Sequence, residues 1–385
     1  MLWRAPSVIK DPVSGLIHMS GVRFSSENVF TWAVLVLFSY YLTVHVNLWV
    51  GLFLILASIS AFFPINSSSS EQAREFVWYG IILYFVCCRY LISEQSKRWM
   101  MNGICILGLI QIVLILLQGA INYDPLMIAA KPLWGSISQY DPIPNVGFMS
   151  CYNGASAFLA ICFPAFLRRK WIWIAPLFIP AFIYSHTFIG PLAVGIIIIC
   201  FVSVKYPYFG KVLIAGLAAG TMITAYWVYV DKPDHNFRYK VWKASLTQHM
   251  PQKPWLGSGI GHWKLVYSRP SFIRQTADIS QKAHFAQAHN EIIQGQFEMG
   301  NLFSIILVGY LLNILRRYRD KAVIPALALI SILITGSTFF IFHIPFTAMV
   351  AIIWVAMLEK TLRGPYENTF SGFVNRRCFF RRRFS

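Results

Sequence analysis

Long runs of apolar residues, separated by short polar segments, dominate the chain. An α-helix needs about 20 mainly apolar residues to cross a bilayer, and many of these runs approach or reach that length. The candidate spans are residues 29–45, 47–63, 75–92, 100–121, 149–167, 171–186, 188–204, 211–230, 290–315, 322–342 and 344–360. The pattern therefore predicts an all-α fold, a polytopic transmembrane bundle of about 11 helices with one long external loop.

Basic clusters predict which side of the membrane each connection occupies. Lys/Arg clusters follow the spans that end at residues 92, 167, 204, 315 and 360. All of them fall on one side, which the positive-inside rule makes cytoplasmic. The predicted organisation is an N-terminal segment 1–28, transmembrane helices in 29–230, an external loop 231–288, transmembrane helices in 289–360 and a basic cytoplasmic tail 361–385. The same rule places the N-terminal segment outside despite its basic residues Arg4, Lys10 and Arg23. Either the first hairpin is then assigned wrongly or one helix is missing from the predicted spans.

The composition narrows the class of protein. Hydrophobic residues make up 57% of the chain and charged residues 12%, with a mean hydropathy of +0.56, which argues against one large soluble core. The net charge of +18 suits anionic membrane lipids, and no nucleic-acid-binding motif accompanies it. The seven cysteines form no CxxC pair, so we expect neither a disulfide framework nor a metal centre. No cofactor motif and no cleavable signal peptide are expected.

The loop 231–288 is strongly basic, with nine Lys/Arg residues against three Asp residues. An external loop of this charge runs against the positive-inside rule and calls for an anionic partner. Lipid headgroups are one candidate, and a phosphate-binding site above the bilayer is the other. Asp231 and Asp234 have a spacing that would suit Mg²⁺ beside a pyrophosphate, but two acids at a helix end are more often solvated caps.

His289 and Asn290 stand where this loop enters an apolar helix. After them, Glu291, Gln294 and Glu298 recur at i, i+3 and i+7 and therefore share one helix face. Polar residues in such a span are expected to face the bundle interior or a watery cavity. Gly300 follows and permits close helix contact. A purely structural hydrogen-bond network, with an interfacial histidine, fits the same pattern.

Two segments upstream carry further signals. Residues 237–243 alternate aromatic and basic side chains, which predicts an amphipathic helix at the membrane interface. Residues 254–263 form a glycine-rich turn, in which Gly257, Gly259 and Gly261 would expose backbone N–H groups to a phosphate. Glycine-rich turns are more often only turns.

Taken in order, these segments resemble the O-antigen ligase and polymerase family of bacterial envelope enzymes. The resemblance rests on Arg-x-x-x-Trp, then Pro-Trp-Leu-Gly-x-Gly-x-Gly, then His-Asn-x9-Gly, together with a helix start at residues 147–159, and covers roughly residues 100–360. Two departures stand out. Phe303 occupies the place of the family's second glycine, and residues 184–190 lack the family's arginine, so that His186 or a loop arginine is left to take that role.

The resemblance implies a GT-C-like helical fold and glycan transfer from an undecaprenyl-pyrophosphate-linked donor to an acceptor sugar hydroxyl. The implied location is the bacterial inner membrane, with the active site facing the periplasm and with a lipid-linked or protein acceptor. Arginines suit the pyrophosphate, and Arg238, Arg269 and Arg274 are the candidates. His289 suits the role of general base, while Asn290 would orient the ring or a sugar, and Glu291 or Glu298 would hold the histidine tautomer.

Three readings of the function remain open. A ligase would attach a finished glycan to its acceptor, whereas a polymerase would join lipid-linked repeat units to each other, and the two differ only in the acceptor. A transporter or flippase of a lipid-linked anion belongs to a different class. Transporters usually show paired broken helices and inverted repeats, which the sequence lacks, so an enzyme that needs no metal is favoured.

Overall fold

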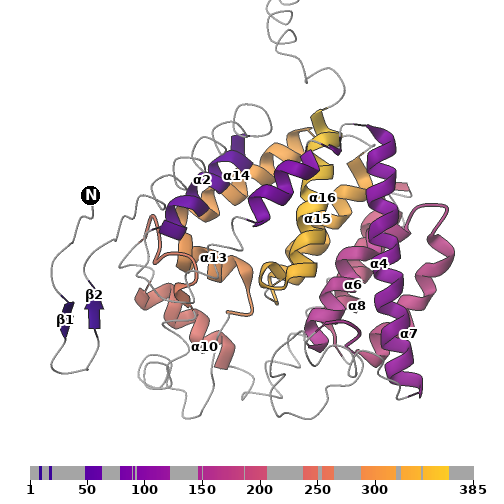
Figure 1. Ribbon diagram of the computed structural model, residues 1–385, viewed down its shortest axis with the longest axis horizontal. Coiled ribbons are helices and arrows are strands. Elements are labelled where there is room, and N and C mark those ends of the chain that lie inside the picture. Colours follow the sequence, from indigo (N-terminus) through magenta and orange to yellow (C-terminus); the bar gives the residue numbers. More distant parts are fainter. Residues whose placement is uncertain are drawn as a thin grey trace, which may run out of the picture.

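The computed structural model describes residues 8–10, 17–19, 48–62, 79–88, 90–91, 93–121, 146–149, 151–185, 187–205, 237–249, 254–263, 288–317, 322–339 and 341–363. Helices account for most of these residues (Figure 1). One exception is an antiparallel pair of short strands near the N-terminus, β1 (Val8–Lys10) and β2 (Ile17–Met19). Outside this pair and the turns between helices, the all-α prediction holds for the described residues.

The larger group of helices surrounds α6. Its members are α4 (Glu94–Ile121), α6 (Tyr152–Phe166), α8 (Ile189–Lys205), α15 (Val323–Gly336) and α16 (Pro345–Arg363). Every residue of α6 from Gly154 to Phe166 is buried, and all four other helices contact it. The small residues Ala155, Ala157 and Ala160 let these neighbours approach closely. α6 is therefore the centre of the main hydrophobic core.

A short 3₁₀ turn, η1 (Ile172–Leu177), and the short helix α7 (Phe178–Tyr184) follow α6 and close this group against α4. Phe178 meets the rings of Phe163 and Phe166 edge-on, with centroids 5.1 and 4.9 Å apart. Such edge-to-face pairs add to the free energy gained from burial alone.

A second group of helices lies beside the first and supplies most of the candidate site (Figure 1). It contains α2 (Leu48–Phe62), α10 (Phe237–Ala244) with the π-turn η3 (Ser245–His249), α13 (Glu291–Met299) and α14 (Asn301–Arg317). α2 packs along α14, where the Trp49 ring covers Gly309. Leu56 of α2 joins Met299 and Ile306 in a small hydrophobic cluster. This contact holds the break between α13 and α14 against α2.

Two glutamines of α4 fix the start of α6. Gln111 donates to the carbonyl of Val146 at 2.8 Å and accepts from the amide of Phe148 at 3.0 Å. Gln118 accepts from the amide of Gly147 at 2.7 Å and donates to its carbonyl at 3.2 Å. These bonds satisfy four backbone groups of a buried turn, which would otherwise be costly to bury. α6 then begins at Tyr152, within the segment 147–159 in which a helix start was predicted.

The predicted membrane spans are borne out only in part. Among the described helices, Glu94–Gly119 and Pro345–Leu362 are long and apolar enough to cross a membrane, judged by length and composition. Shorter apolar helices fall within other predicted spans, namely Leu48–Ala57, Tyr79–Cys88, Tyr152–Phe166, Ile172–Tyr184, Ile189–Val204 and Val323–Gly336. The predicted spans 29–45 and 211–230 lie outside the described residues.

The prediction of one continuous helix over residues 290–315 is wrong. The helix ends at Met299, and a second helix begins at Asn301. Gly300 between them has φ 71° and ψ −167°, a backbone conformation outside the helical region that is open almost only to glycine. The periodicity of apolar residues continues through this point, so the sequence pattern alone did not show the break.

Gly147→Ala tests the glutamine anchor of α6. Gly147 has φ 63°, and a Cβ atom there would overlap the side-chain amide of Gln111. We expect a loss of stability on the order of 1–3 kcal/mol, seen as a lower melting temperature of the purified protein in detergent. Gly103→Ala is the matched control, because nothing lies within 4 Å of a Cβ at that helical position. Equal melting temperatures for the two variants would contradict the anchoring role.

Candidate functional site

The site begins at the N-terminus of α13. Asn290 is the N-cap of this helix, and its side-chain oxygen accepts hydrogen bonds from the amides of Ile292 at 3.0 Å and Ile293 at 3.1 Å. These bonds satisfy two of the donors that every helix leaves open at its start. The amide of Asn290 therefore has a clear structural task here. Its predicted role in orienting a ring or a sugar stays a prediction.

His289 precedes this cap in an unusual backbone conformation. Among the described residues it is the single non-glycine residue with a positive φ, 54°. This left-handed conformation costs a non-glycine residue about 1 kcal/mol or more. The imidazole lies beside Phe339, with ring centroids 6.2 Å apart. A Cβ on Gly154, near the start of α6, would also touch Phe339, so His289 lies close to the N-terminus of the central helix.

Backbone groups of Ala288 hold the chain that leads into His289. The carbonyl of Ala288 accepts from the indole N–H of Trp242 at 2.7 Å. Its amide donates to Oε1 of Gln294 at 3.0 Å. Trp242 belongs to α10, which covers the whole of the predicted amphipathic segment 237–243. That predicted helix is thus present, and it is tied directly to the candidate site.

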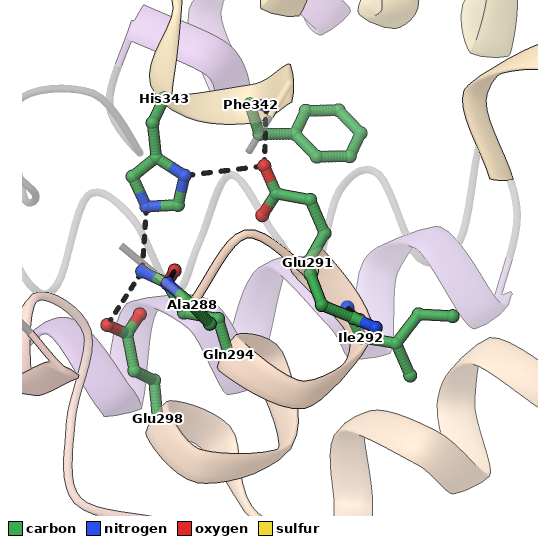
Figure 2. Close-up of polar contacts among 8 residues, drawn as sticks. Ala288, Glu291, Ile292, Gln294, Glu298, Phe342 and His343 are labelled. Atoms are coloured by element: carbon green, nitrogen blue, oxygen red, sulfur yellow. Dashed lines mark hydrogen bonds and ion pairs between the residues drawn. The ribbon is translucent and has the colours of Figure 1, made fainter. Parts of the chain in front are cut away.

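A chain of polar side chains runs from the edge of the site into its interior (Figure 2). Glu291 Oε1 lies 3.3 Å from His343 Nδ1, and it also accepts from the amide of Phe342 at 2.7 Å. His343 Nε2 lies 3.0 Å from Gln294 Nε2. Gln294 Nε2 in turn donates to Glu298 Oε1 at 3.2 Å. The chain links both acids of α13 to the turn η6 (Ile341–His343), which connects α15 to α16.

Glu298 is the inner end of this chain and is 4% exposed. Burial raises the pKa of its carboxyl from 4.5 to about 7. His343, backbone hydrogen bonds from Gly261 and Trp263 and the bond from Gln294 oppose that rise only in part. Glu298 belongs to α13, which is separate from the two described helices that are long enough to cross a membrane. A carboxyl with this pKa holds or releases a proton close to neutral pH.

The glycine-rich turn docks on the C-terminal end of α13. The amides of Ser258 and Gly259 donate to the carbonyls of Phe297 at 2.9 Å and Glu298 at 2.8 Å. Gly257 has φ 67°, and a Cβ there would overlap the backbone of Glu298 and Gly300. The turn therefore satisfies carbonyls that the broken helix leaves open. The amide of Gly259, predicted to bind phosphate, is engaged in this cap.

The residues that were predicted to act together are only partly brought together. Glu298 and Gln294 share a hydrogen bond, as their spacing predicted. Glu291 was predicted to hold the tautomer of His289. In the structure Glu291 contacts a different histidine, His343, which was not predicted from the sequence. One signal was available: residue 343 lies between the predicted spans 322–342 and 344–360, on the same predicted side of the membrane as His289.

Several predicted donor-binding residues lie beyond the part of the chain that the structure describes. Arg269, Arg274 and His186 fall in segments outside it, as do Asp231 and Asp234. Arg238 belongs to α10, the helix that contacts Ala288 through Trp242. Within the described residues, no group of three His, Cys, Asp or Glu side chains is arranged to hold a metal ion.

A scan against protein-family models and a search of curated proteins found no match to this chain. The family resemblance therefore rests on the motifs in the sequence and their order.

Glu298→Gln tests the buried carboxyl. Because its folded-state pKa is raised, Glu298 contributes most stability when protonated, and this contribution is lost as the pH rises through about 7. Glutamine keeps the acceptor oxygen but cannot ionise. We therefore expect the variant to gain stability over the natural protein as the pH rises from 5.5 to 8.5, by roughly 2 kcal/mol at most.

The measurement is the melting temperature of both proteins in detergent across that pH range. A difference between the two proteins that stays constant from pH 5.5 to 8.5 would show that Glu298 has an ordinary pKa.

Proposed function

We propose that this protein transfers a glycan from an undecaprenyl-pyrophosphate-linked donor to an acceptor hydroxyl at the external face of the bacterial inner membrane. The carrying observation is the buried polar chain from Glu291 to Glu298, which lies at a helix break beside His289. Ionisable groups in such apolar surroundings are costly and therefore favour a functional site. The class of reaction is proposed from the order of the sequence motifs, which resembles that of the O-antigen ligase and polymerase family.

Lipid-facing surfaces support the membrane part of this proposal. On α14, Ile305, Val308, Leu312 and Leu315 are between 52% and 72% exposed. They recur at i, i+3, i+7 and i+10 and so form a continuous apolar stripe. α4 carries a similar row of exposed side chains, at Ile106, Ile110 and Val113. Rows of exposed apolar side chains such as these on α4 and α14 suit contact with acyl chains better than contact with water.

The proposed reaction needs little from the protein beyond positioning and charge. The acceptor oxygen attacks the anomeric carbon, the bond from that carbon to the pyrophosphate oxygen breaks, and undecaprenyl pyrophosphate leaves with the electron pair. The hydroxyl proton passes to the imidazole of His289, which acts as general base. Pyrophosphate is a good leaving group, so no strong general acid is required.

Charge that builds on the pyrophosphate needs cationic partners, and arginine is suited to this task by its bidentate geometry. Arg238 is the first candidate, since Trp242 of the same helix donates to Ala288 beside His289. Arg269 and Arg274 belong to the same basic loop and remain candidates from the sequence. Glu291 and Glu298 of α13 and His343 of η6 then serve the acceptor side of the reaction rather than the donor side.

His289→Asn tests the proposal without disturbing the fold. Asparagine tolerates the left-handed backbone better than most residues, but it cannot accept a proton. We expect a rate of glycan transfer lower by about 10²–10⁴, measured with purified protein, lipid-linked oligosaccharide and acceptor. The melting temperature should stay near that of the natural protein.

Undiminished transfer by the His289→Asn variant would remove His289 from the chemistry. The identity of the acceptor that becomes labelled separates two versions of the proposal: a second lipid-linked repeat unit indicates a polymerase, and a different lipid or protein acceptor indicates a ligase. Movement of the donor across the bilayer with no transfer by the natural protein would instead indicate a transporter.

A further inference from the structure

His343 is a second histidine in the site, and it comes from a different part of the fold from His289. It ends the turn η6 between α15 and α16, and its two ring nitrogens face two side chains of α13. Nδ1 lies 3.3 Å from Glu291, and Nε2 lies 3.0 Å from Gln294. Which nitrogen carries the proton follows from the groups around Gln294.

The orientation of the Gln294 amide is set by a backbone group. The amide N–H of Ala288 can only donate, so the side-chain atom 3.0 Å from it must be the oxygen of Gln294. The nitrogen of Gln294 then points the other way, towards Glu298 Oε1 and His343 Nε2. Its two hydrogens match these two acceptors (Figure 2). Reversing the amide would set its NH₂ group against the N–H of Ala288.

This orientation selects one form of His343. Because Gln294 donates to Nε2, that nitrogen accepts and carries no proton. The proton of neutral His343 therefore lies on Nδ1, where it is donated to the carboxylate of Glu291. Protonation of Nε2 would place two donors face to face. It would turn the Gln294 amide, which removes the bond that holds Ala288, or expel the ring, which removes one of the two acceptors that fix this amide.

We propose that His343 is a positioning residue, whose neutral form orients Gln294 and thereby holds Ala288 and His289 in place for the reaction. The measurement of activity rests on the proposed function. The hydrogen-bond geometry around His343 is independent of that function. The path is short: His343 to Gln294, Gln294 to the Ala288 amide, and Ala288 to the left-handed His289. When His343 is protonated, Gln294 no longer holds Ala288 and His289 in the position needed for the reaction.

Two acidic residues of α13 shift the pKa at which His343 takes up a proton. Burial lowers the pKa of His343, but the charge of Glu291, its hydrogen bond to the ring and the charge of Glu298 raise it by more, so the net direction is upward from 6.5. These two acids are the groups that act on His343 within the described part of the chain. His289 is the other titratable group of the site, and its ring faces Phe339.

His343→Gln is the test, with His343→Leu as its counterpart. Glutamine offers an amide oxygen to Gln294 and cannot take a proton near neutral pH, whereas leucine offers no acceptor. We expect transfer by the natural protein to fall on the acid side of its pH profile. The glutamine variant should keep transfer within about tenfold of the natural rate and show a shallower acid limb, because protonation of the general base His289 alone then lowers transfer. The leucine variant should lose transfer at every pH.

Glu291→Gln is an independent check on the same limb. It keeps an acceptor for His343 and for the amide of Phe342 but removes the charge that raises the pKa of His343. The acid limb should therefore move to lower pH. An acid limb that is unchanged in both glutamine variants would overturn the proposal.

Hydrogen–deuterium exchange of residues 288–299 tests the geometry without any substrate. After correction for the intrinsic effect of pH, these amides should lose protection in the natural protein as the pH falls, and they should do so much less in the His343→Gln variant. Glu298 titrates in both proteins, so the difference between them isolates His343. If the natural protein shows no transfer, the proposed function fails while this comparison still decides the positioning role. Equal loss of protection in both proteins would overturn that role.

Discussion

The side-chain amide of Gln294 is the interaction on which the candidate site depends. Its oxygen holds the backbone of Ala288, and its nitrogen meets Glu298 on its own helix and His343 on the turn between α15 and α16. One buried group, 3% exposed, thereby joins the residues just before α13, α13 itself and the turn η6, whose His343 lies 49 residues further along the chain. An amide with fixed partners at both ends cannot reverse without leaving buried donors opposed, so it fixes the protonation of its neighbours.

The broken helix explains why such a network is possible in apolar surroundings. A continuous helix over residues 290–315 would have carried Glu298 along one straight face, whereas Gly300, with its positive φ, ends α13 after nine residues. The freed carbonyls of Phe297 and Glu298 accept from the amides of Ser258 and Gly259. The glycine-rich turn and the helix break therefore depend on each other, because each would leave unsatisfied backbone groups without its partner.

The sequence predicted what is local and periodic. The polar stripe of α13 follows from the spacing of Glu291, Gln294 and Glu298, and the buried bond between the last two agrees with that spacing. His343 was not predicted, because it comes from a turn between two other helices and its contact with Glu291 depends on tertiary packing. The break at Gly300 was not predicted either, because the spacing of apolar residues does not change there. Backbone conformation and long-range contacts therefore account for what was missed.

The proposed reaction releases undecaprenyl pyrophosphate beside a buried network that holds a proton. Its most direct test is stoichiometric: purified protein in lipid vesicles is given lipid-linked oligosaccharide and an acceptor, and both products are counted over the same time course. The proposed function predicts one undecaprenyl pyrophosphate released for each glycan joined to an acceptor. Donor that crosses the bilayer with its pyrophosphate bond intact, and no glycan joined, would contradict it.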